Sequence, residues 1–565
     1  MMTEYTVSDF NVKKLGSFYF PDKTVFRVFA PDHAELELVI AGHPYQMHRS
    51  GLYFEIALGG DLEGVRYHYR TSKGLCFRDP FAYVSIGEDS VVVNREKFET
   101  EKILLPEMKD VIIYEANVRD FSSSPSWNGT LRSKFLSLKE EGLKKDGTYP
   151  IGLDYLKDLG ITHLQLMPVL DYDNDHSSYN WGYNPMAYNC VKADYVLDQD
   201  DPYAYVNEFR QTVNALHKNG IRVVLDVVFN HVYDPKNCDL EKMLPGHIFR
   251  YRPDGTLAEG TLCGNEVKTE DPFVREYLCE MVLRYLNLFD IDGLRLDLMG
   301  ICDLDTVNRI YQTARIYKKD FIVYGEGWNM GDVLAEGRRG TIQNRLMMPG
   351  IGMFNDYFRG VMTHYISGND GIMKKVESAL MGSPEYLGAS QSINYVECHD
   401  GLTLFDHLCR YKADDDLTVN IRRCKLALGL VTVARGIPFF HMGQEFLRTK
   451  LGVENSYNSG DLINGIDWDL RVANSAICDY FRDLISVRKQ YGEFRDENVE
   501  ITFENRDNCL VYQIGALTVL INPGDIDFLY QDGKTYEIIL NNSGRCNIFS
   551  DSVTVESHSL VICKG

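Results

Sequence analysis

The sequence predicts an α/β protein built on a (β/α)₈ TIM barrel, with an N-terminal β-sandwich and a C-terminal all-β domain. Three observations predict this fold class. The first hundred residues alternate apolar and polar positions, as strands with one buried face do. From Val111 onward, short apolar runs alternate with longer amphipathic segments, which is typical of βα units around a parallel sheet. After about Gly492 the strand-like alternation returns.

The N-terminal part is predicted to be a small β-sandwich spanning residues 1–107. Its alternating runs are bounded by turn residues such as Pro31-Asp32, and they end near residue 80, so a linker follows. The candidate strands are 24–30, 34–40, 53–58 and 65–70.

The central part, residues 108–492, contains eight short apolar runs with helical patterns between most of them. Eight parallel strands fit a closed barrel better than an open doubly wound sheet. An insertion at about 232–271 separates the third strand from the helix that follows it. The candidate strands are 111–117, 162–168, 222–229, 293–298, 321–325, 351–355, 392–398 and 438–443.

The C-terminal part, residues 493–565, is predicted to be a second β-sandwich. Its apolar runs are short and closely spaced, with Gly, Asn and Asp between them. The candidate strands are 501–503, 509–513, 517–521, 536–540 and 552–562.

Composition limits the partners that this chain is expected to have. Lys and Arg number 59 against 81 Asp and Glu, a net charge of −22 that repels nucleic acid and anionic membranes but is indifferent to a neutral sugar. No secretory signal and no apolar stretch of about 18 residues is visible. The 13 cysteines form no CxxC pairs, which favours free thiols in a reducing compartment. We expect a cytoplasmic monomer without cofactor or metal.

Acidic and basic side chains end four of the predicted barrel strands, where barrel enzymes carry their catalytic groups. The four strand ends are DVVFNH at 226–231, RLD at 295–297, YGE at 324–326 and ECHD at 397–400. Each pattern alone also fits a helix cap or a buried ion pair. Four of them, in order around one barrel, indicate an active site.

Asp297 and Glu326, on neighbouring strands, match the needs of a retaining glycosidase. Such an enzyme uses a carboxylate nucleophile and a protonated carboxyl about 5 Å apart. Arg295 precedes Asp297 by two residues in an extended strand, so it points to the same side and keeps Asp297 ionised. Glu326 has no cation beside it in the sequence, and apolar surroundings raise a carboxyl pKa toward that of a general acid. Asp400, ionised opposite the pair, stabilises positive charge on the sugar ring.

These motifs resemble the four signature regions of glycoside hydrolase family 13, the α-amylase family. The segment YNWGYNP at 179–185, together with YGEGW at 324–328, resembles the type I pullulanase signature within that family. TVFRVFAP at 24–31 resembles the N-terminal carbohydrate-binding-type β-sandwich of pullulanases and isoamylases. The segments around Gly264 and at 453–468 also resemble pullulanase motifs, so the similarity covers nearly the whole chain.

The resemblance implies a role for each matching residue. Asp297 matches the nucleophile, Glu326 the acid/base and Asp400 the carboxylate that stabilises the transition state. The residues assigned to substrate binding or to its support are Arg295 beside the nucleophile, His231 and His399 on hydroxyls of the −1 glucose, Tyr183 as a stacking platform, and Asp226 behind Arg295.

Trp181 and Trp328 are also assigned to substrate binding, since indole rings stack on sugars, although core packing is an equal alternative. Asn230 lies where some relatives place a calcium ligand. No Asp-rich loop follows it, so no metal is expected.

The resemblance implies retaining hydrolysis of α-1,6-glucosidic linkages in pullulan, glycogen, amylopectin or limit dextrins. Alternatives on the same site are isoamylase-type debranching, neopullulanase-like α-1,4 hydrolysis and glucan branching. A different class is an inactive glucan-binding relative. The chain departs from the family pattern at Asn184, Cys398 and Gly401, where Asp, Ser and Asn are usual, and these positions bear on the linkage preference.

Overall fold

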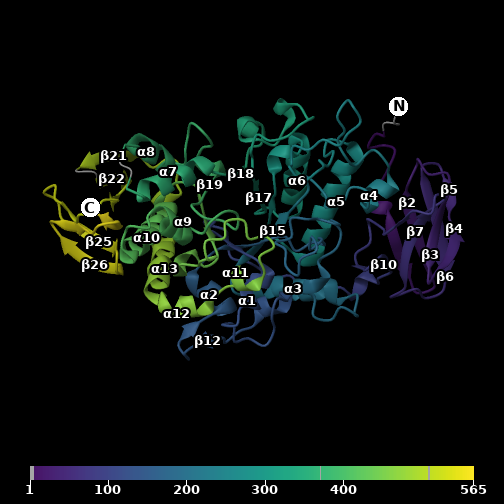
Figure 1. The fold of residues 1–565 in the computed structure, drawn as a ribbon, viewed down its shortest axis with the longest axis horizontal. Helices are drawn as coiled ribbons and strands as arrows, with labels where there is room; N and C mark the ends of the chain where they lie inside the picture. The colour runs from purple at the N-terminus through teal and green to yellow at the C-terminus, as the bar shows by residue number, and fades with distance from the viewer. Residues whose placement is uncertain (1–4, 369–370, 507–508) are drawn as a thin grey trace.

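The structure, a computed structural model, describes residues 5–368, 371–506 and 509–565. Its three parts lie in a row (Figure 1): an N-terminal pair of sheets at one end, a closed barrel in the middle and a C-terminal sheet at the other end. The predicted (β/α)₈ barrel flanked by β structure on both sides is confirmed.

The N-terminal part consists of a four-stranded sheet and a six-stranded sheet. The second sheet continues through β9 and β10 to Val91, beyond the end predicted near residue 80, because strands of two or three residues leave no alternation to detect. The strands are β1 Gly16–Phe20, β2 Lys23–Phe29, β3 Leu36–Ile40, β4 His43–Gln46, β5 His48–Ser50, β6 Tyr53–Gly59, β7 Arg66–Thr71, β8 Cys76–Phe77, β9 Ser85–Ile86 and β10 Asp89–Val91.

The barrel is closed by eight parallel strands, and each strand overlaps the apolar run that predicted it. The barrel strands are β11 Ile113–Ala116, β14 His163–Leu166, β15 Arg222–Val227, β16 Gly293–Leu296, β17 Ile322–Gly325, β18 Ile351–Phe354, β19 Ser392–Asn394 and β20 Ile437–His441. A small hairpin, β12 Lys144–Lys145 with β13 Tyr149–Pro150, lies outside the barrel.

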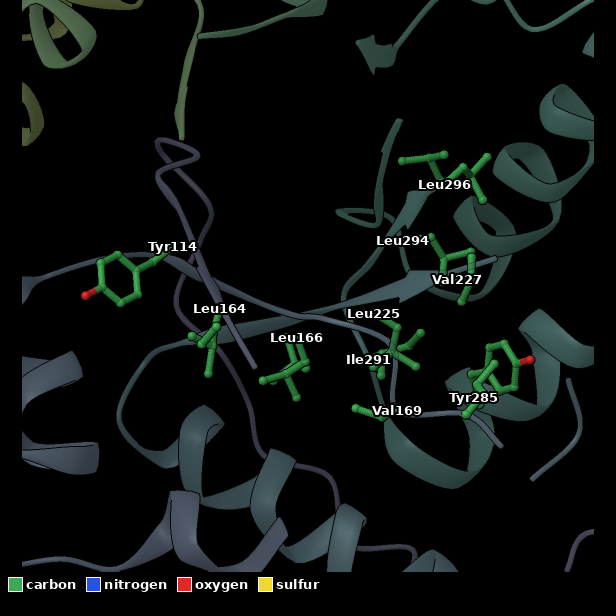
Figure 2. Close-up of a cluster of buried hydrophobic side chains, with 14 of the residues drawn as sticks. Tyr114, Leu164, Leu166, Val169, Leu225, Val227, Tyr285, Ile291, Leu294 and Leu296 are labelled. Carbon is green, nitrogen blue, oxygen red and sulfur yellow. The ribbon is translucent and has the colours of Figure 1, made fainter. Parts of the chain in front are cut away.

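Helices surround the barrel and cover its apolar outer face. Leu225 of β15 and Leu294 of β16 are fully buried and gather with Tyr285 of α5 (Figure 2). The helices are α1 Val118–Ser123, α2 Gly152–Leu159, α3 Ala204–Lys218, α4 Asp239–Met243, α5 Pro272–Phe289, α6 Leu304–Tyr317, α7 Asp356–Ile366, α8 Met373–Leu380, α9 Leu404–Tyr411, α10 Leu417–Val433, α11 Asp461–Asn464, α12 Trp468–Ala473 and α13 Ser475–Gln490.

Alternate strand positions carry polar side chains inside the barrel. Because side chains alternate along a strand, the residues between the outward-facing leucines point inward. The parallel register then sets Asp226 of β15 beside Arg295 of β16, and Arg295 beside Tyr324 of β17. The alternation of side chains along the paired strands therefore places these polar residues at the same height inside the barrel, without any contribution from the loops.

The N-terminal sandwich is joined to the barrel by aromatic stacking and by the half-buried cation of Arg78. Phe29 stacks on Phe273 of α5, with ring centroids 5.3 Å apart and an interplanar angle of 15°. Arg78 donates from Nε to Asp239 Oδ2 at 2.8 Å and from Nη1 to Asp171 Oδ2 at 3.0 Å. These contacts fix the sandwich against the α5 side of the barrel.

The C-terminal part is a six-stranded sheet with a two-stranded sheet, and it packs on α10. Gly429 of α10 allows the approach, because a Cβ there would lie 1.9 Å from Leu560 of β28. The run predicted at 552–562 is two strands, with His558 at positive φ between them. The strands are β21 Ile501–Arg506, β22 Cys509–Ile514, β23 Leu517–Asn522, β24 Phe528–Tyr530, β25 Tyr536–Asn541, β26 Gly544–Ser550, β27 Val553–Val555 and β28 Ser559–Lys564.

Within the described part of the chain, no helix combines the length and the apolar character that crossing a bilayer requires. The cysteines of this described part form no disulfide bond.

Candidate active site

Arg295 is the centre of a cluster of carboxylates at the carboxyl end of the barrel strands. Its guanidinium is 1% exposed. Nη1 donates to Asp226 Oδ1 and to Asp297 Oδ1, both at 2.9 Å, and Nη2 donates to Glu326 Oε1. Asp297 and Glu326 therefore share one buried cation, and their carboxyl groups face the same space.

Asp297 is held by both of its carboxylate oxygens. Oδ1 accepts from Arg295, and Oδ2 accepts from Asn230 Nδ2 at 2.9 Å. Asn230 also donates to the Asp297 backbone oxygen at 2.7 Å. The two hydrogen bonds to the carboxylate oxygens, one of them from a guanidinium, fix the orientation that a nucleophile needs.

Glu326 lies in a loop that packs closely on the loop after β16. Oε2 accepts from the Leu298 backbone amide at 3.1 Å, and the Glu326 carbonyl accepts from the Gly300 amide at 2.8 Å. A Cβ at Gly300 would lie 1.9 Å from the Trp328 carbonyl oxygen, so the loops can meet only at a glycine. Burial raises the pKa of Glu326, although the Arg295 charge opposes the rise, and the nearby Asp297 charge adds to it. A raised pKa keeps the proton that a general acid must donate.

Tyr183 lies over the cluster on the segment that follows β14. Its hydroxyl donates to Asp226 Oδ2 at 2.7 Å, and its ring stacks on His399 with centroids 5.0 Å apart. The preceding Gly182 has φ +102°, and a Cβ there would lie 2.9 Å from Pro168, so only a glycine allows this close approach. Burial raises the pKa of Asp226 to about 7, while Arg295 opposes the rise.

His399 is held from beneath by Glu115 of β11, a residue that the sequence analysis missed. The His399 backbone amide donates to Glu115 Oε2 at 2.7 Å, and Nδ1 lies 2.8 Å from Oε1. Gln165 of β14 also donates to Oε1 at 2.9 Å. Burial alone would raise the pKa of Glu115, but His399 and Arg295 lower it; in turn Glu115 raises the pKa of His399 against the effect of burial. The sequence signal for this role was a single acidic residue, Glu115, inside the apolar run IIYEA at 112–116.

His231 lies beside the carboxylate that Asn230 holds. Nδ1 is 2.6 Å from Asn230 Oδ1, and Nε2 is 3.0 Å from the Tyr183 carbonyl oxygen. Burial lowers the pKa of His231. The His231 ring therefore links the backbone of Tyr183 to Asn230, the residue that holds Asp297.

The two tryptophans lie in different surroundings. Trp181 is 6% exposed; the edge of its ring meets His399 at 5.2 Å, and Nε1 donates to Asn464 Oδ1 at 3.4 Å. Trp328 is half-buried and packs against the apolar cluster inside the barrel, which includes Tyr324. Among the described contacts, neither indole reaches Asp297 or Glu326.

Asp400 follows His399 directly and is exposed. It lines a cleft of about 670 Å³ together with Arg359, Cys398 and Gly401. Gly401 has φ +82°, and a Cβ there would meet no atom within 4 Å, so this glycine leaves space in the cleft. Asp400 is the one predicted catalytic carboxylate outside the Arg295 cluster.

No group of three or more His, Cys, Asp or Glu side chains is placed to hold a metal ion within residues 5–368, 371–506 and 509–565. Asn230, which resembled a calcium ligand, donates its amide to Asp297 instead. The arrangement offers a fixed carboxylate, a protonatable carboxyl and a stacking ring, which is the set of groups for glycosyl transfer.

Residues 151–241 match the family model of the alpha amylase catalytic domain. The pullulanase of Bacillus subtilis (strain 168) is 36% identical over 517 residues, which cover 85% of this chain and 72% of the relative. Isoamylase 1 of Arabidopsis thaliana is 25% identical over 572 residues, 80% of this chain and 68% of the relative. The crystal structure of pullulanase complexed with maltotetraose from Anoxybacillus sp. LM18-11 superimposes with a TM-score of 0.94 at 31% identity, over 98% of this chain and 88% of that chain. The chain belongs to the pullulanases, the debranching glycoside hydrolases of the α-amylase family.

Proposed function

We propose that this enzyme hydrolyses α-1,6-glucosidic linkages of α-glucans with retention of configuration, using Asp297 as nucleophile and Glu326 as acid/base. One observation carries the assignment: both carboxyl groups bind the same buried guanidinium, that of Arg295. Two carboxyl groups held by one guanidinium lie close together, which supports the short spacing of a retaining enzyme over the wider gap in which an inverting enzyme seats its water.

In the first step, Glu326 donates its proton to the glycosidic oxygen while Asp297 attacks the anomeric carbon. The bond between that carbon and oxygen breaks, the released chain leaves with the proton, and the sugar becomes covalently bound to Asp297. In the second step, Glu326 takes a proton from water, whose oxygen attacks the anomeric carbon and frees Asp297. The configuration is inverted twice and so retained.

The surrounding residues orient the sugar during both steps. Tyr183 offers a ring face, His231 and His399 bind hydroxyl groups, and Asp226 holds Arg295 from behind. Asp400 stabilises the positive charge on the sugar ring once substrate fills the space between it and the cluster. Trp181 positions His399, as its buried ring supports, and Trp328 borders the acceptor side.

We divide the chain into an N-terminal sandwich at 1–107, a catalytic barrel at 108–492 with an insertion at about 232–271, and a C-terminal domain at 493–565. The enzyme works as a cytoplasmic monomer on pullulan, glycogen, amylopectin or limit dextrins. The absence of disulfide bonds among the cysteines of the described residues supports a reducing compartment.

The test is the product formed from pullulan. Maltotriose is expected, since it is released when the α-1,6 linkages are cut; panose would contradict the proposal and indicate α-1,4 cleavage. Activity on glycogen but not on pullulan would indicate isoamylase-type debranching. The matched control is Asp297→Asn, for which we expect a loss of at least about 10³-fold in kcat. Retention of more than a trace of activity would remove the role given to Asp297.

A further inference from the structure

Lys450 is a buried cation next to the loop that carries His399 and Asp400. It lies on the segment that follows β20 and is 1% exposed. Its Nζ donates to the His399 backbone carbonyl at 2.9 Å, and among the described residues no carboxylate forms an ion pair with it. A buried ammonium without a paired carboxylate is costly. The position therefore calls for a function beyond packing.

The ammonium of Lys450 also lies over the ring of Trp181. Nζ is 5.2 Å from the ring centroid, a cation–π contact that replaces part of the lost hydration. The edge of the same ring meets the His399 ring, with centroids 5.2 Å apart. One side chain thus contacts the segment that carries Tyr183 and the loop that carries Asp400.

The backbone of Lys450 is fixed by α9, the helix that follows this loop. Asp406 Oδ2 accepts from the Lys450 amide at 2.7 Å, and Oδ1 accepts from the Thr449 hydroxyl at 2.5 Å. The far end of the loop is held where the Leu404 amide donates to Glu397 Oε2 at 2.7 Å. The Lys450 side chain therefore extends from a rigid base into the middle of a loop whose end is already fixed.

The charges of Lys450 and Asp400 attract each other across the loop. Burial and the neighbouring Arg448 lower the pKa of Lys450, whereas Glu397 and Asp400 oppose the fall. Because the attraction is mutual, the ammonium also favours the ionised carboxylate of Asp400. Lys450 thus combines a mechanical contact with a charge of the sign that this carboxylate needs.

We propose that Lys450 is a positioning residue for the hydrolysis, which fixes where Asp400 lies relative to the bound sugar. It acts through the His399 carbonyl and the Trp181 ring. The inference rests on the proposed function for the role of Asp400. Because that carboxylate stabilises charge that develops only in the transition state, its displacement lowers kcat more than it raises KM.

The kinetic test is Lys450→Met, which keeps the length of the stem but removes the donor and the charge. We expect kcat on pullulan to fall by about 10- to 100-fold, with a smaller change in KM, since a hydrogen bond from a charged group is lost. Lys450→Arg keeps a charged donor and should recover most of the lost kcat. The matched control is Lys425→Met in α10. Lys425 also donates to a carbonyl, that of Asn542 in the C-terminal domain at 2.5 Å, and lies 4.6 Å from the Tyr480 ring centroid.

Hydrogen exchange of the ligand-free protein tests the positioning without catalysis. The amides of residues 399–403 should exchange faster in Lys450→Met than in the wild type, whereas Lys425→Met should leave both their exchange and kcat unchanged. Unchanged exchange or unchanged kcat in Lys450→Met would overturn the proposal. So would equal losses of kcat in Lys450→Met and Lys450→Arg, or in Lys450→Met and Lys425→Met. If the wild type does not cut pullulan, the proposed function fails, and faster exchange in Lys450→Met would still show that Lys450 fixes the loop.

Discussion

Glu115 and His399, 284 residues apart in the chain, are joined by two hydrogen bonds inside the barrel. The Glu115 carboxylate accepts from the backbone amide of His399 and pairs with its Nδ1, so both the ring and the loop that carries Asp400 are fixed from the first barrel strand. Glu115 is a positioning residue: it acts on the sugar only through His399.

Glu115→Gln is expected to lower kcat/KM on pullulan by about 10- to 100-fold, because one charge-assisted hydrogen bond of about 1.5–3 kcal/mol is lost. Since Glu115 raises the pKa of His399, the variant should also titrate His399 at lower pH. The measurements are kcat/KM against pH and NMR titration of the histidine. A uniform loss of activity with an unshifted His399 titration would indicate a merely structural role.

Glu326→Gln removes the proton donor. Because the pKa of Glu326 is raised, the wild-type enzyme keeps its acid protonated to a higher pH than an ordinary glutamate, and it loses activity as the pH rises through that pKa. The variant should lose about 10²- to 10⁴-fold activity on pullulan. With α-maltotriosyl fluoride, whose leaving group needs no proton, the first step should persist and show no alkaline decline. Equal losses on both substrates would contradict the assignment.

Gly182→Ala is expected to lower both stability and activity. The new Cβ would combine a strained φ of +102° with a contact of 2.9 Å to Pro168, and it would displace the neighbouring Tyr183. We expect a destabilisation of about 1–3 kcal/mol and a higher KM. The control is Gly220→Ala, where φ is +76° but no atom lies within 4 Å. Gly220→Ala should be destabilised while its kcat and KM stay unchanged. A loss of activity in that control would show that backbone strain alone explains the activity loss of Gly182→Ala.

Glu397→Gln is expected to flatten the dependence of stability on pH. Burial raises the pKa of Glu397 to about 8, whereas an unfolded glutamate has a pKa of about 4.3. Between these values the folded state binds the extra proton, so stability falls as the pH rises, by up to about 1.4 kcal/mol per pH unit. Glutamine has no such proton. Urea unfolding at pH 5 and pH 8 measures the difference; parallel curves for the two proteins would contradict the prediction.

The sequence predicted the barrel well because its strands are buried on both faces and appear as continuous apolar runs. Of the predicted site residues, Asp226, Asp297 and Glu326 gather around Arg295 in the structure, and their roles in catalysis stay predictions. The sequence did not predict the short strands β9 and β10, which are too brief to alternate. Nor did it reveal that Glu115 supports His399, or that Asn230 holds Asp297, because those partners meet only when the barrel closes. The exposed setting of Asp400 likewise depends on a loop.

The ion pairs of Arg78 determine whether the barrel can be studied without the N-terminal domain. Cutting away the N-terminal domain would leave Asp171 and Asp239 without their cation and would uncover the ring of Phe273. Both acids are only partly buried and would become hydrated, so the larger cost is the exposure of apolar side chains such as Phe273, about 1.5–3 kcal/mol for each large one. A truncated barrel would thus be destabilised for reasons unrelated to sugar recognition, so point substitutions are the cleaner way to separate what the domain binds from what it stabilises.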